Sequence, residues 1–486
     1  MLSLELVAVG LTSPGGKVHA AGRGRPNVVV VMTDDQRVGD LSVMHKTRRL
    51  LKHGGTTFTN SFVTFSLCCP SRVTLLTGQY AHNHGVVAND PPHGGYPAYR
   101  RKVNQKHTLP VYLHRAGYRT GLVGKFLNSY GVANPRQIPR GWDSWQALTM
   151  GTEHFMYGYT LNSNGRLRRR DGSPSDYQTD VLSRRADRFV RQSSHRRRPF
   201  FLLFATGAPH EEPEGLVGSH PHRNPRPAPR DLNRFEHKRL PRPPSFNERK
   251  IRDKPPFLRP PRLSTAEKHS LLRLYRSRLE SLLAVDDAVK RLVHTLRRTG
   301  ELRRTVIIFT SDNGYMLGEH RHRGKELPYE ESMRVPLIIR GPGFPKAAHR
   351  SQLAANIDLA PTIVDLAHAP GRKRMDGISL LRFAGDPTRG RQRDILFERA
   401  AFEGRRFASV RTPRYVFTRY AHTNRPRYGS EFYDLKRDPY ELRNRAASPA
   451  YAQVRKVLLP LLRALRNCRR SGCRGIRGVG PPPTPR

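Results

Sequence analysis

The sequence predicts an α/β protein built on a large, mostly parallel sheet. Short apolar runs rich in β-branched and aromatic residues stand at 28–32, 120–123, 200–204 and 306–309. They lack the polar alternation of a half-exposed strand, which indicates strands that are covered on both faces. Stretches of helical character lie between them, and strands that alternate with helices form parallel sheets.

The clearest helix begins after Ser264. Ser264 and Glu267 have the spacing of a capping box, in which each side chain accepts a hydrogen bond from the other's backbone N–H. The helix is expected to extend to Gly300. One stripe of it carries the apolar residues Tyr275, Leu279, Leu282, Val289, Val293 and Leu296. Such a stripe is typical of a helix that packs one face on a core.

Polar residues follow each of the four predicted strands. They are Asp34 and Asp35 after the first, Lys125 after the second, His210 after the third, and Asp312 and Asn313 after the fourth. Ligands of parallel sheets bind beyond the carboxyl ends of the strands, so we expect these side chains in one crevice. Carboxylate and amide oxygens are hard ligands, which favours Ca²⁺, with Mg²⁺ as the other candidate.

Taken singly, each of these residues also has an ordinary structural interpretation. Asp34 and Asp35 could cap a helix, and the segment 311–314 could be a plain turn. His210 follows a proline and could be a loop residue. Their common position at the ends of strands is what favours a site.

The segment 65–78 reads as a loop that enters a helix. Pro70 fits the first turn of that helix and Gly78 fits its end. Cys68 and Arg72 would then lie near a helix N-terminus, which favours anions. The alternative is that the adjacent cysteines are small buried apolar residues.

Length and charge limit the functional classes. The chain has 486 residues, enough for one large domain and a smaller one. No apolar run approaches the roughly 18 residues of a membrane-spanning helix. The 87 Lys and Arg against 39 Asp and Glu give a formal net charge of +48, which allows a polyanionic partner. The basic residues are spread along the whole chain, so we expect a basic surface and no nucleic-acid partner.

The two ends of the chain favour export. Residues 1–26 resemble a weak secretory leader, with a short apolar stretch and a small-residue ending, although Glu5 interrupts it and a basic start is lacking. A cytoplasmic protein with a ragged end is the alternative. Cys468 and Cys473 could close a disulfide in the tail 468–486, and a disulfide implies an oxidising compartment. The Pro- and Arg-rich segment 211–262 is expected to be a surface insertion.

Several motifs resemble those of a known family. The string C-x-P-S-R followed by L-x-T-G, which begins at Cys68, resembles the signature of the sulfatases in the alkaline phosphatase superfamily. The string NVVVVMTDDQ precedes it, and GYRTGLVGKF, APH, FTSDNGYMLGEH, GKELPYEESMRVPLIIRGPG and EFYDLKRDPYELRN come after it, all in the family's order, so the resemblance covers 27–445. The run LCCPSR…TGQYAHNHGV together with GKFLNSYG is most similar to N-acetylglucosamine-6-sulfatases and extracellular heparan sulfatases, with bacterial arylsulfatases beside them.

This resemblance implies an alkaline phosphatase-like α/β/α sandwich over 27–375. It also implies a smaller C-terminal domain with an antiparallel sheet over 376–467. The implied activity is hydrolysis of sulfate monoesters, of a sulfated sugar similar to N-acetylglucosamine-6-sulfate or of an aryl sulfate. The alternatives are a phosphonate or phosphate ester hydrolase of the same superfamily and an inactive polyanion-binding protein.

The resemblance also assigns roles to residues. A formylglycine-generating enzyme would oxidise Cys68 to formylglycine, the nucleophile, and leave Cys69 unchanged. The divalent cation would be held by Asp34, Asp35, Asp312, Asn313 and the modified Cys68. Arg72 would steady the formylglycine, Lys125 and Lys325 would bind sulfate oxygens, and His210 would act near the leaving oxygen as an acid or as a sulfate ligand.

The sequence departs from the family's pattern at one position. Many sulfatases have a histidine two residues after the lysine of the second signature, where this chain has Leu127. The nearest polar group is Asn128, which we expect to contact the substrate. His82, His84 and His322 lie close to matched motifs and are expected to support the site or to contact the substrate.

Overall fold

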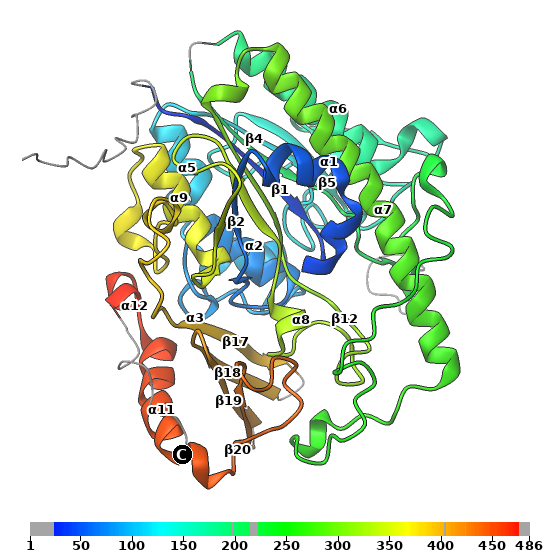
Figure 1. Ribbon diagram of the computed structural model, residues 1–486. Coiled ribbons are helices and arrows are strands. Elements are labelled where there is room, and N and C mark those ends of the chain that lie inside the picture. Colours follow the sequence, from blue (N-terminus) through cyan, green and yellow to red (C-terminus); the bar gives the residue numbers. More distant parts are fainter. Residues whose placement is uncertain (1–23, 197, 214–221, 403–404, 423, 476–486) are drawn as a thin grey trace, which may run out of the picture.

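The computed structural model describes residues 24–196, 198–213, 222–402, 405–422 and 424–475 (Figure 1). The expected leader up to residue 23, residues 214–221 of the expected insertion and the end of the tail from residue 476 lie outside these ranges. Within the described residues, no helix is both long enough and apolar enough to cross a membrane.

A ten-stranded sheet forms the centre of the large domain, in the order β15-β2-β14-β11-β1-β8-β4-β5-β6-β7. Its strands are β1 (Asn27–Thr33), β2 (Gly55–Phe58), β4 (Arg119–Gly124), β5 (Ser144–Thr149), β6 (Thr160–Ser163), β7 (Arg166–Arg169), β8 (Phe200–Ala205), β11 (Thr305–Ser311), β14 (Leu337–Arg340) and β15 (Ala348–Arg350). The four strands predicted from apolar runs lie side by side and parallel as β11-β1-β8-β4. The prediction of a mostly parallel α/β sheet is therefore confirmed.

Helices cover both faces of this sheet (Figure 1). They are α1 (His45–Thr47), α2 (Cys68–Thr77), α3 (Ala81–His84), α4 (Gly95–Lys102), α5 (Leu109–Arg115), α6 (Gln178–Ser194), α7 (Thr265–Arg298), α8 (Glu330–Met333), α9 (Leu359–Leu366) and α10 (Leu381–Ala384). Alternate residues of a strand point to opposite faces. Val29 and Val31 of β1 therefore pack with α6 and α7, whereas Val28 and Val30 pack with α2, α5 and α9. The capping box of Ser264 and Glu267 is formed at the start of α7.

Three two-stranded pairings complete the large domain. They join β3 (Ser61–Phe62) to β16 (Ala354–Ala355), β9 (Glu212–Pro213) to β10 (His222–Arg223), and β12 (Met316–Leu317) to β13 (Arg323–Gly324). The described part of segment 211–262 is mostly irregular and reaches the C-terminal sheet, because Phe257 stacks on Tyr428 and Asn444 donates to Asp253.

The C-terminal region forms the expected antiparallel sheet. Its strands run in chain order, β17 (Ile395–Phe402), β18 (Arg405–Arg411), β19 (Tyr415–His422) and β20 (Arg425–Asp434). Helix α11 (Ala452–Asn467) covers one face of this sheet with Val454, Leu458 and Leu462 (Figure 1). A disulfide between Cys468 and Cys473 closes the turn that leads into α12 (Ser471–Gly475).

Candidate active site

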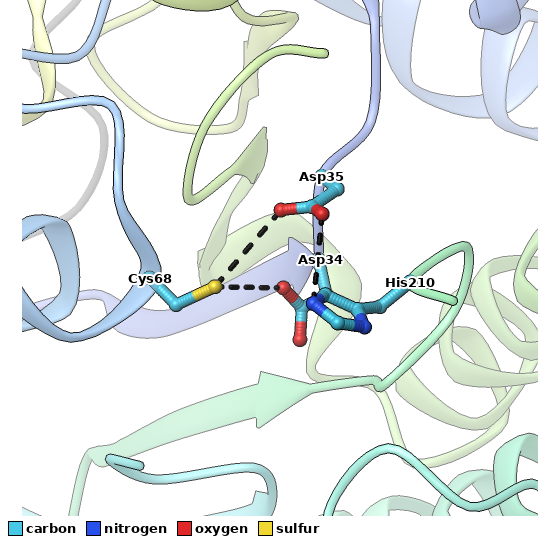
Figure 2. A group of neighbouring side chains, drawn as sticks. All are labelled: Asp34, Asp35, Cys68 and His210. Atoms are coloured by element: carbon cyan, nitrogen blue, oxygen red, sulfur yellow. Dashed lines mark hydrogen bonds and ion pairs between the residues drawn. The ribbon is translucent and has the colours of Figure 1, made fainter. Parts of the chain in front are cut away.

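The strand register brings the polar strand ends to one level of the sheet. Thr33, the last residue of β1, lies opposite Ser311, the last residue of β11. Gly124, at the end of β4, lies opposite Ala205, at the end of β8. The residues that follow these strands therefore emerge together above the carboxyl edge. Figure 2 shows the result: Asp34, Asp35, Cys68 and His210 converge, and their potential ligand atoms all lie within 4.8 Å of one another.

Cys68 is the first residue of α2 and is fully buried. Its Sγ lies 3.4 Å from Asp34 Oδ1 and 2.9 Å from Lys325 Nζ. Burial, together with the nearby charge of Asp34, raises the pKa of the Cys68 thiol far above its usual range. The thiol is therefore neutral near pH 7, and a neutral thiol is a poor nucleophile. Cys69 is also buried and packs in the apolar core between α2 and the sheet.

Arg72 lies one turn further along α2 and joins the helix to two strand ends. Its Nε donates to Asp312 Oδ2 at 2.8 Å, and its Nη1 donates to the carbonyl oxygen of Lys125 at 2.9 Å. Only 3% of Arg72 is exposed. Charge-assisted hydrogen bonds in such a dry setting hold the start of α2 rigidly over the sheet.

Two lysines balance the carboxylates: Lys125 is fully buried and Lys325 is half-buried. Lys125 Nζ donates to Asp34 Oδ2, and Lys325 Nζ donates to Asp35 Oδ1. Burial alone would raise the pKa of Asp34 and of Asp35, but these cations outweigh it and hold both pKa values below the usual range. The same pairs outweigh burial at the lysines, where the pKa is raised. Both aspartates are ionised at neutral pH.

The oxygen ligands at this edge fit a hard divalent cation. Asn313 donates through Nδ2 to Asp35 Oδ1 at 2.6 Å, whereas its Oδ1 is buried without a hydrogen-bond partner among the described residues. Asp312 Oδ1 accepts from the backbone N–H of Asp35 at 3.0 Å, and each carboxylate oxygen keeps a further lone pair. An unpartnered amide oxygen beside three aspartates is a donor set suited to Ca²⁺ or Mg²⁺.

His154 also belongs to this cluster, although no sequence motif indicated it. Its Nε2 lies 2.7 Å from Lys125 Nζ, and its ring stacks on that of His210 with centroids 3.8 Å apart. Burial and the neighbouring His210 and Lys125 lower the pKa of His154, so its imidazole is neutral and can accept from the lysine. His154 follows β5, whose sequence Ser144–Thr149 contains Gln146 and so lacks the continuous apolar run of the predicted strands. The sequence therefore carried no comparable signal for His154.

Arg278 was also missed, because it lies in the middle of α7 and far from any motif. It is fully buried, and its guanidinium donates to the backbone carbonyls of Asp35 and Pro209. Arg278 therefore fixes the loops that carry Asp35 and His210. His210 itself lies with its Nε2 3.6 Å from Asp35 Oδ2.

The remaining predicted residues lie outside the cluster. Asn128 is buried beside Gly95 and Cys69, and its Oδ1 has no hydrogen-bond partner among the described residues. His84 is a core residue that bonds to Thr74 of α2. His82 bonds to Glu398 and to the carbonyl oxygen of Cys468, and His322 lies on the turn between β12 and β13. Asn128 as a substrate contact stays a prediction.

Comparison with known proteins agrees with this geometry. Residues 26–369 match the sulfatase family, and residues 318–468 match the family described as N-sulphoglucosamine sulphohydrolase, C-terminal. The chain is 39% identical to an extracellular sulfatase Sulf-1 homolog of Caenorhabditis elegans over 73% of this chain and 48% of that one. It is 38% identical to human N-acetylglucosamine-6-sulfatase over 74% of this chain and 65% of that one. It is 32% identical to an arylsulfatase of Volvox carteri over 97% of this chain and 79% of that one.

Solved structures share the fold. A protein determined in complex with its substrate D-glucosamine-2-N,6-O-disulfate superposes with a TM-score of 0.74 at 24% identity, over 94% of this chain and 100% of the other. A phosphonate monoester hydrolase from Silicibacter pomeroyi superposes with a TM-score of 0.70 at 22% identity, over 91% and 96%. The chain spans less than two thirds of the length of its first two curated relatives. With a family match over most of its length and a matching fold, the chain belongs to the sulfatase family.

Proposed function

We propose that this protein hydrolyses sulfate monoesters, with Cys68 in its formylglycine form and a divalent cation, Ca²⁺ or Mg²⁺, at Asp34, Asp35, Asp312 and Asn313. The observation that most directly supports this proposal is the environment of Cys68. Its buried thiol is held neutral but is surrounded by Lys325 and by two carboxylates that suit a metal. A cysteine in this position has little use as a thiol, whereas a modified side chain there would be placed for covalent catalysis.

Each residue of the site would have a distinct role in the reaction. Oxidation of Cys68 would supply the hydrated aldehyde as nucleophile, and the cation would lower the pKa of that nucleophile and screen the sulfate oxygens. Lys125 and Lys325 carry fixed positive charge where the sulfate oxygens would lie, so they would stabilise charge that builds up in the transition state. Arg72 would hold Asp312 and the start of α2 in place.

His210 would act at the leaving oxygen, and His154 would orient His210. His210 lies beside Asp35 at the open side of the cluster and would protonate the departing alcohol or bind the sulfate. The neutral ring of His154 stacks on it and accepts from Lys125, so it would fix the orientation of both side chains. His154 thus occupies a place beside the lysine for which the sequence, with Leu127 two residues after Lys125, offered no histidine.

Two adjoining cavities support a sulfated sugar as the substrate. One of about 200 Å³ is lined by Leu67 and Glu326, the neighbours of Cys68 and Lys325 in the chain. The other, of about 470 Å³, lies between the C-terminal sheet and α11. Both are lined by Phe65, Val87 and Arg399, so they adjoin. The larger cavity is lined by Arg399, Arg406, Arg419, Arg463 and Arg466, with Glu398 as the single carboxylate among its lining residues. This charge suits further sulfate groups of an oligosaccharide.

The double variant Arg463→Ser/Arg466→Ser is expected to raise KM for a sulfated oligosaccharide by roughly three- to tenfold at low salt, since each exposed cation contributes up to about 1 kcal/mol. KM for a small aryl sulfate should not change. Arg297→Ser/Arg298→Ser is a control with the same loss of charge. Those arginines end α7, which precedes β11 and so lies at the opposite edge of the sheet. Equal effects of the two double variants on the oligosaccharide would rule out the cavity as a binding site.

A phosphonate or phosphate ester hydrolase is the second candidate, because a phosphonate monoester hydrolase shares this fold. Steady-state kinetics on an aryl sulfate, an aryl phosphate and an aryl phosphonate separates the two functions. The proposal expects the highest kcat/KM on the sulfate, and mass spectrometry of the peptide containing Cys68 should detect the aldehyde. A higher kcat/KM on either phosphorus ester, or an unmodified thiol in the active enzyme, would contradict the proposal.

We further propose that the protein acts outside the cytoplasm. The disulfide between Cys468 and Cys473 favours an oxidising compartment, and two relatives are named extracellular sulfatases.

A further inference from the structure

A second group of potential metal ligands lies apart from the active site, where the large domain meets the segment after β20. His320 follows β12, Glu331 belongs to α8, and Glu441 follows β20. The nitrogen of His320 and one oxygen of each glutamate lie within 4.8 Å of one another. His320 and Glu441 are at most 1% exposed. None of these residues takes part in the chemistry proposed above.

The hydrogen bonds of His320 determine which ring nitrogen carries a lone pair. Its Nδ1 lies 2.8 Å from Glu248 Oε2, and Lys254 Nζ lies 3.2 Å from the same oxygen. Burial raises the pKa of Glu248 to about 7, although Lys254 opposes this shift. When Glu248 is ionised, its oxygen accepts from the N–H of Nδ1, and Nε2 presents its lone pair to Glu331 and Glu441. Histidines that bind metals are usually oriented in this way, with the other nitrogen donating to a carboxylate.

The two glutamates each use one oxygen and leave the other without a partner. Glu331 Oε1 accepts from the hydroxyl of Ser245 at 3.0 Å, and Glu441 Oε2 accepts from the backbone N–H of Glu330 at 3.0 Å. Glu331 Oε2, Glu441 Oε1 and His320 Nε2 are buried and have no hydrogen-bond partner among the described residues. Three acceptors thus face one another without a donor, which is costly in a buried site.

Burial and neighbouring carboxylates raise the pKa of Glu331, to about 7, and the pKa of Glu441, and no described cation outweighs this. The neighbouring carboxylates have their own partners: Glu319 pairs with Arg37, Glu248 with Lys254, and Glu330 with Arg411, while Glu431 accepts from three tyrosine hydroxyls. Glu331 and Glu441 are left without a described cation on their open oxygens. A shared proton would not satisfy all three acceptors, because Glu331 Oε2 lies 4.0 Å from His320 Nε2, beyond hydrogen-bond reach.

We propose that His320, Glu331 and Glu441 bind a structural zinc ion, with water as the fourth ligand. An imidazole nitrogen with two carboxylate oxygens is a set that zinc accepts. An ion between three atoms up to 4.8 Å apart lies at most roughly 2.8 Å from each, so side-chain rotations of about half an ångström reach the 2.0–2.2 Å of zinc ligands.

The ion would connect two parts of the chain that are far apart in the sequence. His320 and Glu331 lie on either side of Lys325 in the sequence, and Glu441 comes from the C-terminal region. The zinc would therefore tie both ends of the segment that carries Lys325 to the C-terminal region.

The test measures bound metal and does not depend on turnover. The full-length protein is stripped with a chelator, saturated with Ca²⁺, given one equivalent of Zn²⁺, gel-filtered and analysed by elemental mass spectrometry. We expect about one zinc per chain in the wild type and a rise in Tm on its addition. Glu331→Gln and Glu441→Gln should each lower zinc affinity at least about tenfold and abolish the rise in Tm, with calcium content unchanged.

Glu280→Gln is the matched control. Glu280 is a buried carboxylate of α7 that accepts from the backbone N–H of Phe235, away from this group. This variant should retain zinc like the wild type. Because Glu331 is partly exposed, its variant is expected to fold even if Glu441→Gln does not. Absence of zinc from the wild type, or equal retention by the wild type and Glu331→Gln, would overturn the proposal.

Discussion

Replacement of Cys68 by alanine is expected to lower kcat/KM on an aryl sulfate by roughly 10⁴-fold or more, because it removes the proposed nucleophile. The fold should persist, since Asp34, Asp35 and Asp312 keep their ion pairs with Lys125, Lys325 and Arg72. Steady-state kinetics and the Tm of the variant provide the measurement.

Cys69→Ala is the matched control for this prediction. Cys69 differs from Cys68 by one position and is equally buried, but its side chain packs in the apolar core. We expect a loss of about 1–2 kcal/mol of stability, as for small core truncations, and activity within a few-fold of the wild type. If the two variants lost activity equally, the assignment of Cys68 as the nucleophile would fail.

Removal of the divalent metal is expected to have the next largest effect. Without the cation, the three aspartates would remain paired with Lys125, Lys325 and Arg72, so the protein should stay folded but lose at least about 10³-fold in turnover. The measurement is turnover after dialysis against a chelator and after addition of Ca²⁺ or Mg²⁺ alone. Calcium at a hundred times its Kd should also stabilise the fold by about 2.7 kcal/mol.

Asp35→Asn separates the catalytic metal from the proposed zinc. The variant keeps the size of the side chain but removes a charged oxygen at the active site, which is formed by different residues from those of the zinc group. It should resemble the chelated enzyme in turnover, show little stabilisation by calcium and still retain zinc. Full activity of the wild type after verified removal of calcium and magnesium would contradict the proposed metal site.

The sequence predicted the four central parallel strands and most of the candidate site. Strands that are buried on both faces need continuous apolar runs, so β1, β4, β8 and β11 were readable without a structure. The polar residues that end these runs follow the strands directly. Parallel strands end at the same edge, so a site containing Asp34, Lys125, His210 and Asp312 followed from order along the chain.

Residues at a distance along the chain could be placed only by the tertiary structure. His154 comes from a loop after a strand that was not predicted, and it joins the site because β5 pairs with β4. Arg278 reaches Asp35 across 243 residues from a helix stripe that looked purely apolar. His84, in contrast, lies close to a motif but is held in the core by Thr74.

The proposed zinc ligands, too, could be brought together only by the tertiary structure. His320, Glu331 and Glu441 have no ligand spacing in the sequence, since the last lies more than a hundred residues beyond the others. Periodicity and motifs report which residues are buried and which strands end in polar groups, because those properties arise from neighbours in the chain. Which distant side chains meet depends on strand register and helix packing, which only the folded chain sets.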